Sequence, residues 1–297
     1  MRWFSTIVSL FFCTISTHLL AQGRLGTDFS PKLIPIVNGI YAYEGYLSLP
    51  GEDEIIRTNS LVVITNEGVV VVDGQDDEEK ASALITAISA ITDQPIRYLI
   101  NASPHGDHVN GNAVFKESTI IAHEKAKQSM ISAGVSVLPS IVYAEEMTLH
   151  LGGMTLELHY FGPAHTAGDT IVYIPEERVA FLSEIYFNGV FTSLIEGFSE
   201  SHIKAIELTK ALDVEWFIPG HGIIDGKSAT ELSAGLDVYL NNVKAVHNFV
   251  LKHIVAGDSM EKTLSFMDTE LHPFTEVPFY HYLGERSVRA TFEALSN

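Results

Sequence analysis

Apolar and polar residues alternate along the chain with two different periods, which predicts strands and helices in turn. TNSLVVIT and VVVVD flank the turn 66–68 and predict a β-hairpin that ends at Asp73. Residues 76–91 begin with acidic residues and continue with apolar residues at helical spacing, which predicts a helix. IRYLIN then predicts a buried strand, followed by a strand at 119–122 and a helix over 123–133.

The second half shows a similar order of elements. MTLHL and MTLELHY predict two strands, TIVYI and RVAFL predict a hairpin around 175–177, and a helix is expected over 202–212 before the strand EWFIP. From Lys227 onward the pattern is mainly helical. With 297 residues, 46% of them hydrophobic, the chain is long enough to bury one substantial core, and we expect one large domain over 33–297.

The first residues indicate where the protein is located rather than how it folds. Arg2 precedes the apolar run FSTIVSLFFCTISTHLLA, which is too short for a membrane-spanning helix and is typical of a secretory signal. We expect residues 1–21 to be removed after Ala21, residues 22–32 to form a linker, and the mature protein to be periplasmic or secreted, without a membrane span. The alternative is an uncleaved anchor or a buried helix.

Charge and cysteine content limit the chemistry. The chain has 18 basic and 37 acidic residues, which argues against nucleic acid or an anionic membrane as a partner and leaves a small-molecule substrate. The single cysteine, Cys13, lies in the expected signal, so the mature chain would have no disulfide and no thiolate ligand. Catalysis would therefore use His, Asp, Glu or hydroxyl groups.

Four histidines stand directly after predicted strands, where a rigid scaffold can bring side chains together. His105 and His108 follow IRYLIN within the stretch NASPHGDHVNGN, His165 follows LELHYF, and His221 follows EWFIP. Imidazole and the carboxylate of Asp107 are ligands that zinc accepts. Alone, the H-x-D-H pattern is also compatible with a solvated loop whose Asp caps a helix.

Three further motifs follow along the chain, each after a predicted strand. They are GPAHTAGD at 162–169, SE at 183–184 and PGHG at 219–222. With the opening hairpin TNSLVVITNEGVVVVDGQ, they resemble the metallo-β-lactamase superfamily over about residues 33–297. The resemblance implies a mixed α/β (α+β) fold, the four-layer αββα sandwich. It also implies one metal site with His105 and His165, and a second with Asp107, His108 and His221.

Two residues depart from that family's pattern. Ser103 stands in place of the first motif histidine, and a hydroxyl is a poorer zinc ligand than imidazole. Glu184 stands in place of the bridging aspartate and is one methylene longer. We expect Glu184 to lean into the space left by Ser103 and to complete a weakened first site. One or two zinc ions are therefore expected; iron is the less favoured alternative.

Other residues have more than one interpretation. We expect Asp73 to be structural or to support a ligand, and Asp169 either to orient the His165 imidazole or to shape a loop. The aromatic residues of IYFNGVFTSLIEGF line a substrate pocket or belong to the core, and residues 44–57 are expected to form a hairpin flap. The histidines without ligand spacing are expected to be structural: His123, His150, His159, His202, His247, His253, His272 and His281.

The resemblance and the site together predict an exported zinc-dependent hydrolase. Metal-bound water would attack an ester, thioester, lactone or lactam carbonyl, and with one ion Asp107 or His105 would act as general base. Two alternatives remain: a non-catalytic or accessory metal-binding protein, for example one associated with quinoproteins, whose first site is degenerate, and a dedicated β-lactamase.

Overall fold

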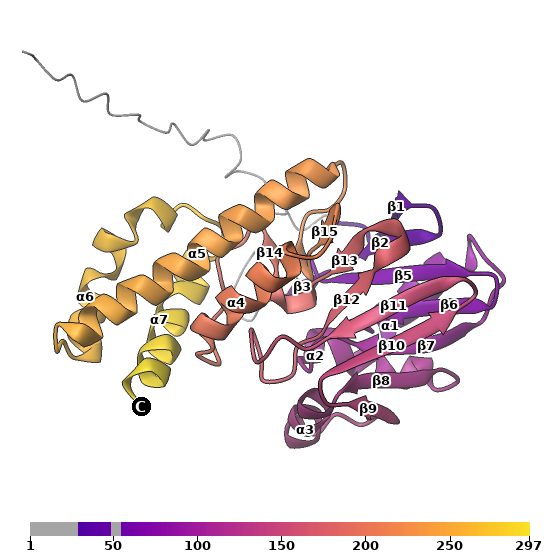
Figure 1. Cartoon of the computed structure of the whole chain (residues 1–297), viewed down its shortest axis with the longest axis horizontal. Helices are drawn as coiled ribbons and strands as arrows, with labels where there is room; N and C mark the ends of the chain where they lie inside the picture. Colours follow the sequence, from indigo (N-terminus) through magenta and orange to yellow (C-terminus); the bar gives the residue numbers. More distant parts are fainter. Residues whose placement is uncertain (1–28, 49–54) are drawn as a thin grey trace, which may run out of the picture.

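The computed structural model describes residues 29–48 and 55–297, and these residues form two facing β-sheets with helices on both outer sides (Figure 1). The expected signal at 1–21 and most of the expected linker at 22–32 lie outside the described residues. The first strand begins at Lys32, next to the expected start of the domain at residue 33.

The first sheet has seven strands and contains the predicted N-terminal hairpin, which is confirmed. In spatial order these are β1 (Lys32–Val37), β2 (Ile40–Glu44), β5 (Asn59–Thr65), β6 (Gly68–Val72), β7 (Ile96–Asn101), β8 (Thr119–His123) and β9 (Ile141–Tyr143). Pairs from β1 to β6 are antiparallel, and those from β6 to β9 are parallel. Helix α1 (Glu78–Ser89) connects β6 to β7, as a parallel pair requires.

The second sheet has five strands and contains the predicted hairpin at 170–182. They are β10 (Glu146–Leu151), β11 (Met154–His159), β12 (Ile171–Ile174), β13 (Val179–Phe181) and β15 (Trp216–Ile218). Strands β12 and β13 pair antiparallel around the short helix η3 (Pro175–Glu177). Strands β13 and β15 pair parallel, and helix α4 (Ser199–Lys210) lies in the connection between them.

Three apolar clusters divide the molecule into four layers. Between the sheets lie Val63, Val70, Val72, Leu158, Val172 and Phe181. Helix α1 packs Leu84 and Ile88 on Val62 and Val71 of the first sheet. Helices α4 and α5 (Ala229–Val255) cover the other sheet, with Ala205, Leu236, Ala180 and Phe217 in one cluster. The expected αββα sandwich is therefore confirmed, because each sheet buries one face against the other and one against helices.

Local sequence explains where the main helices begin. The Asp77 carboxylate accepts a hydrogen bond from the backbone N of Lys80 at 2.8 Å and caps α1. His123 caps α3 (Glu124–Ala133), because its Nδ1 accepts from the backbone N of Lys125. Ser228 and Glu231 form a reciprocal capping box at the start of α5.

The C-terminal third is helical and adds to the layer formed by α4 and α5. Helix α6 (Met260–Glu270), the short helix η5 (His272–Phe274) and α7 (Tyr280–Ser296) follow α5, and α7 lies against it (Figure 1). Among the described helices, none has the length and apolar character needed to cross a membrane. Strands β3 (Leu47–Ser48) and β4 (Ile55–Ile56) pair as the base of the expected flap, whose tip at 49–54 is outside the described residues.

The end of β15 lies tightly against the segment that follows β13. Gly220 donates its backbone N–H to the carbonyl oxygen of Ser183 at 2.8 Å. A Cβ atom at Gly220 would lie 2.3 Å from the carbonyl carbon and oxygen of Ser183, closer than side-chain carbons approach backbone. Residues 183–184 and 221 are therefore held in register by a position that only glycine fits.

We predict that Gly220→Ala destabilises the protein by about 1–3 kcal/mol, because the added methyl forces the two segments apart. The matched control is Gly284→Ala in α7, where the nearest heavy atom to a new Cβ is 3.5 Å away. That change is expected to be neutral or stabilising by up to about 1 kcal/mol. Urea unfolding of both variants checks this, and an unchanged midpoint for Gly220→Ala would contradict the packing argument.

Candidate metal centre

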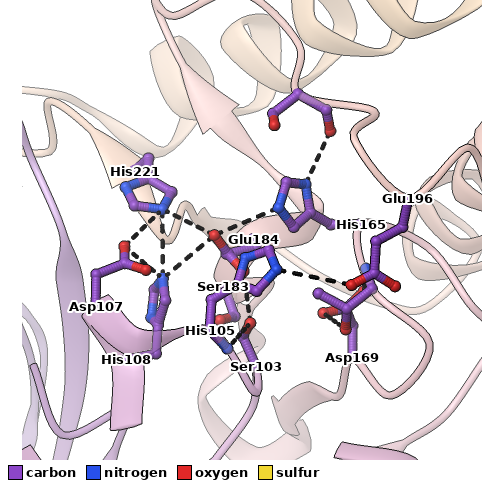
Figure 2. Close-up of polar contacts among 12 residues, drawn as sticks. Ser103, His105, Asp107, His108, His165, Asp169, Ser183, Glu184, Glu196 and His221 are labelled. Carbon is purple, nitrogen blue, oxygen red and sulfur yellow. Dashed lines mark hydrogen bonds and ion pairs between the residues drawn. The ribbon is translucent and has the colours of Figure 1, made fainter. Parts of the chain in front are cut away.

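The four histidines predicted as ligands meet at one edge of the sandwich (Figure 2). The short helix α2 (Gly106–Val109) follows β7; His105 is the residue just before it, without a side-chain capping hydrogen bond, and His108 lies within it. His165 lies in the connection from β11 to β12, and His221 begins β16 (His221–Gly222) after β15. Glu184 is in the short helix η4 (Ser183–Ile185) directly after β13. Each donor therefore follows a strand, and the two sheets bring these strand ends together.

One group of donors combines Asp107, His108, His221 and Glu184. The Nε2 atoms of His108 and His221 are 3.3 Å apart, and each lies 3.3 Å from Oδ2 of Asp107. Oε1 of Glu184 is 3.3 Å from Nε2 of His221 and 3.8 Å from Nε2 of His108. Donors this close, around one point, can share a cation.

A second group, which corresponds to the first metal site expected from the sequence, combines His105, His165 and Glu184. Nδ1 of His105 lies 2.7 Å from Oε2 of Glu184, and Nε2 of His165 lies 3.5 Å from Oε1. The rings of His105 and His165 meet edge to face with centroids 4.9 Å apart. Glu184 thus belongs to both groups, with one oxygen toward three imidazoles and the other toward His105.

Ser103 lies beside Glu184 and His105, and its Oγ accepts a hydrogen bond from the backbone N of His105 at 3.3 Å. Its hydroxyl donates a hydrogen bond to Oε2 of Glu184 at 2.5 Å, and it is fully buried. The short serine side chain leaves the room into which the longer glutamate side chain extends. Glu184 and Ser103 together occupy the space next to His105.

Each of three imidazoles is oriented by a hydrogen bond on the nitrogen that faces away from the centre. Nδ1 of His108 contacts Oδ2 of Asp73 at 2.8 Å. Nδ1 of His165 donates to the carbonyl oxygen of Ser193, and Nδ1 of His221 donates to that of Arg57, both at 2.8 Å. These contacts fix the ring orientation and direct Nε2 of each imidazole toward the centre, where it could bind a cation once it is deprotonated.

Asp73 and Asp169 have different surroundings. Asp73 is fully buried and accepts hydrogen bonds from the backbone N of Ala102 at 2.8 Å and from Oγ of Ser183 at 2.6 Å, in addition to His108. It therefore joins three segments of the centre. The carboxylate of Asp169 instead accepts from the backbone N and the hydroxyl of Thr166, at 2.6 and 2.7 Å. Asp169 shapes the loop that carries His165, whose imidazole is oriented by Ser193.

The acidic surroundings raise the pKa of some imidazoles and not of others. Burial lowers the pKa of His165 to about 4, so its imidazole is neutral at pH 7. Burial would also lower the pKa of His108, but the carboxylates of Asp107 and Asp73 raise it to about 10. Burial opposes ionisation of Glu184, yet the nearby His105 and His165 hold its pKa well below the usual range. The centre therefore keeps its carboxylate ionised, which favours a cation.

The donor groups open into a cleft of about 180 Å³. Its apolar walls include Leu47, Ile56, Phe187 and Leu283, and Arg286 supplies a guanidinium. Leu283 and Arg286 belong to α7, so the C-terminal helix contributes to the cleft. Of the aromatic residues after Glu184, Phe187 lines the cleft, whereas Tyr186 and Phe191 are fully buried in the core.

Several residues that complete the centre carry no signal in the sequence that marks them as part of it. These are Arg57 and Ser193, which act through backbone carbonyls, Ser183, and Glu196, whose Oε1 lies 3.8 Å from Nε2 of His105. A carbonyl exists at every position, so no residue type could have signalled the first two. Of the eight histidines expected to be structural, none belongs to either donor group within the described residues.

The part of the chain that carries the donor groups is similar to known proteins. The family model described as "Metallo-beta-lactamase superfamily" matches residues 55–221. The metallo-beta-lactamase type 2 of Bacteroides fragilis is 21% identical over 76% of this chain and 93% of its own, and that of Bacillus cereus is 25% identical over 73% and 86%. The 2,4-dinitroanisole O-demethylase subunit alpha of Nocardioides sp. is 27% identical over 57% of this chain, and the match spans 53% of that subunit.

Solved structures agree on the fold. A metallo-beta-lactamase from Pontibacter korlensis has a TM-score of 0.61 at 24% identity, covering 72% of this chain and all of the other. The metallo-beta-lactamase IND-7 has a TM-score of 0.62 at 20% identity, covering 74% of this chain and all of the other. The family model covers more than half of the chain and includes every donor described above, so the chain belongs to the metallo-β-lactamase superfamily.

Proposed function

We propose that this protein is a zinc-dependent hydrolase that cleaves an ester, thioester, lactone or lactam carbonyl. The observation that carries the proposal is the shared carboxylate of Glu184, which joins two groups of imidazole and carboxylate donors at the floor of a cleft. Membership in a superfamily of mostly metallo-hydrolases supports the reaction class. A substrate carbonyl that enters the cleft meets these donors directly.

The donor set fits zinc better than a hard cation. Zinc takes imidazole nitrogen and carboxylate oxygen in roughly tetrahedral sites at about 2.0–2.2 Å, whereas magnesium and calcium take oxygen alone. Both groups offer imidazoles in addition to Glu184, and the first adds the Asp107 carboxylate. When bound, zinc would polarise a carbonyl oxygen and lower the pKa of a water.

Asp107 is the residue we assign to proton transfer. Its Oδ2 lies 3.3 Å from Nε2 of both His108 and His221 and accepts a hydrogen bond from Oγ1 of Thr58 at 3.4 Å. Both Asp107 and Glu184 line the cleft, and the Asp107 side chain is the more exposed of the two, at 11% against 4%. Asp107 can therefore orient a water at the substrate side and accept its proton. His105 faces Glu184 and Glu196, which favours a role as a ligand.

The walls of the cleft support a substrate with an apolar part beside its carbonyl. Leu47, Ile56 and Phe187 offer apolar contact, and the Arg286 guanidinium lies over the Tyr282 ring at 4.1 Å. We propose export on the basis of the apolar run at 4–21 in the sequence. The mature chain would then have no thiolate ligand, which makes a general carbonyl hydrolase the broader assignment than a dedicated β-lactamase.

A second function is favoured by Ser103 alone. A hydroxyl in place of an imidazole leaves the second donor group with two histidines and Glu184. A group that binds its ion weakly suits an accessory metal-binding protein with no turnover. The two functions differ in whether bound zinc is accompanied by hydrolysis.

We predict that the purified mature protein contains zinc and hydrolyses at least one member of a chromogenic ester, thioester, lactone and lactam panel. Chelation is expected to abolish turnover. Asp107→Ala is expected to lower kcat/KM by about 10²–10⁴, because proton transfer and one metal ligand are lost together. Metal analysis by mass spectrometry and steady-state rates measure both effects.

The control for this experiment is Asp93→Ala, an exposed carboxylate outside the centre, which should keep full activity. Bound zinc without turnover on any substrate of the panel would favour the accessory function. Iron in place of zinc would point to redox chemistry.

We also predict that Ser103→His combined with Glu184→Asp raises the apparent zinc affinity of the second donor group by about tenfold or more. The added imidazole replaces a hydroxyl, and the shorter carboxylate vacates the space that it needs. Zinc titration with a chromophoric competitor measures the change, with Ser103→Ala as the control that adds no ligand. An unchanged affinity in a double variant with normal melting temperature would contradict this account of the two departures.

A further inference from the structure

A second pocket, of about 150 Å³, lies next to the cleft that holds the donor groups, and the proposed hydrolysis does not involve it. It is bounded by one face of α5 and by the segments 187–190 and 277–278. Most of its lining is apolar: Phe187, Val190, Ile223, Val238, Tyr239 and Val277. Ala234 and Val238 are exposed, so the pocket opens to solvent along α5.

Small residues on α5 create the pocket. Gly235 packs against β14 (Phe187–Asn188), where a Cβ atom would lie 2.3 Å from Oδ1 of Asn188, so the helix approaches the strand closely. Ala234, next to it, is too short to fill the space beside this contact. The α5 residues that line the pocket fall at positions 231, 234/235, 238/239 and 242, so they recur every three or four residues, as one helix face requires.

The lining also includes four polar or charged residues, and Asn242 is the most buried of them; the others are Asn188, Lys227 and Glu231. Asn242 is 2% exposed, and its side chain has no hydrogen bond within the described part of the chain. Its amide atoms are not among the fully enclosed atoms without a partner, so they reach the space of the pocket. A primary amide has two N–H donors and one acceptor oxygen, and these are available to a molecule that enters the pocket. The amide is therefore placed to bind a polar atom of a molecule in the pocket.

We propose that this pocket binds a small, largely apolar molecule that carries one hydroxyl or carbonyl group, of the size of a phenol. A cavity of about 150 Å³ holds one benzene-sized molecule. The apolar lining contacts the ring or alkyl part, and Asn242 forms the hydrogen bond that selects a polar substituent.

The pocket is a neighbour of the metal centre and not part of it. Phe187 lines both spaces, and its ring centroid lies 4.5 Å from that of His221 and 5.6 Å from that of Tyr239. No metal donor lines the pocket. Binding there consequently does not depend on the hydrolase function, and either proposal can fail without the other.

The test compares phenol with toluene, which has the same shape but no hydroxyl, by NMR titration of the full chain with and without zinc. Phenol is expected to bind about fivefold more tightly than toluene, because only phenol hydrogen-bonds to Asn242. Asn242→Leu is expected to remove this preference while toluene still binds. Ala234→Trp should block both ligands by filling the pocket from an exposed position, and Thr230→Trp, exposed on the same helix, should not.

Melting temperatures show whether each variant is folded before its binding is judged. Absence of binding by both ligands to the unaltered protein would overturn the proposal, as would unchanged binding in folded Ala234→Trp. A phenol preference that survives Asn242→Leu would overturn the assigned role of the amide. Ester turnover, measured in parallel, tests only the hydrolase.

Discussion

The structure depends on one buried carboxylate, that of Glu184, held among four imidazoles. A buried charge is unfavourable unless it is paired and hydrogen-bonded, and Glu184 has His105 at 2.7 Å and the Ser103 hydroxyl at 2.5 Å on one oxygen. Its other oxygen faces His165 and His221. The same carboxylate thus stabilises the meeting of loops from both sheets and supplies the charge that attracts a cation.

The scaffold places these groups through the strand ends and a second buried carboxylate. Asp73 accepts hydrogen bonds from Ala102, His108 and Ser183, and so ties the ends of β6 and β7 to the segment after β13. Gly220 allows the end of β15 to lie against that segment. Rigid elements on both sides of the centre therefore hold the donors before any ion binds, which is what a preorganised site requires.

Ser103 and Glu184 are physically coupled. The short serine side chain leaves space beside Glu184, and its hydroxyl donates a hydrogen bond to Oε2 of that carboxylate. The second donor group contains two imidazoles and this carboxylate. Glu184 thus contributes to both donor groups while Ser103 binds one of its oxygens.

The sequence by itself determined the elements and the chemistry at their ends. The period of apolar residues predicted the hairpins β5–β6 and β12–β13 and the helices α1 and α3, because burial and local hydrogen bonding set these elements over a few residues. Motifs at strand ends singled out His105, His108, His165 and His221. Periodicity was enough for the elements, whereas the candidate ligand set also required the resemblance of several ordered motifs to a known family.

Only the tertiary structure decided how those residues are held and what surrounds them. His221 is oriented by a carbonyl 164 positions away and His165 by one 28 positions away, and any residue type provides such a carbonyl. The Asp169 carboxylate accepts a hydrogen bond from Thr166 within its own loop. Helix α7 contributes residues to the cleft of the donor groups, and Asn242 lines a pocket formed by segments distant in the sequence. These contacts follow from how two sheets and their helices pack, and no local period in the chain encodes that packing.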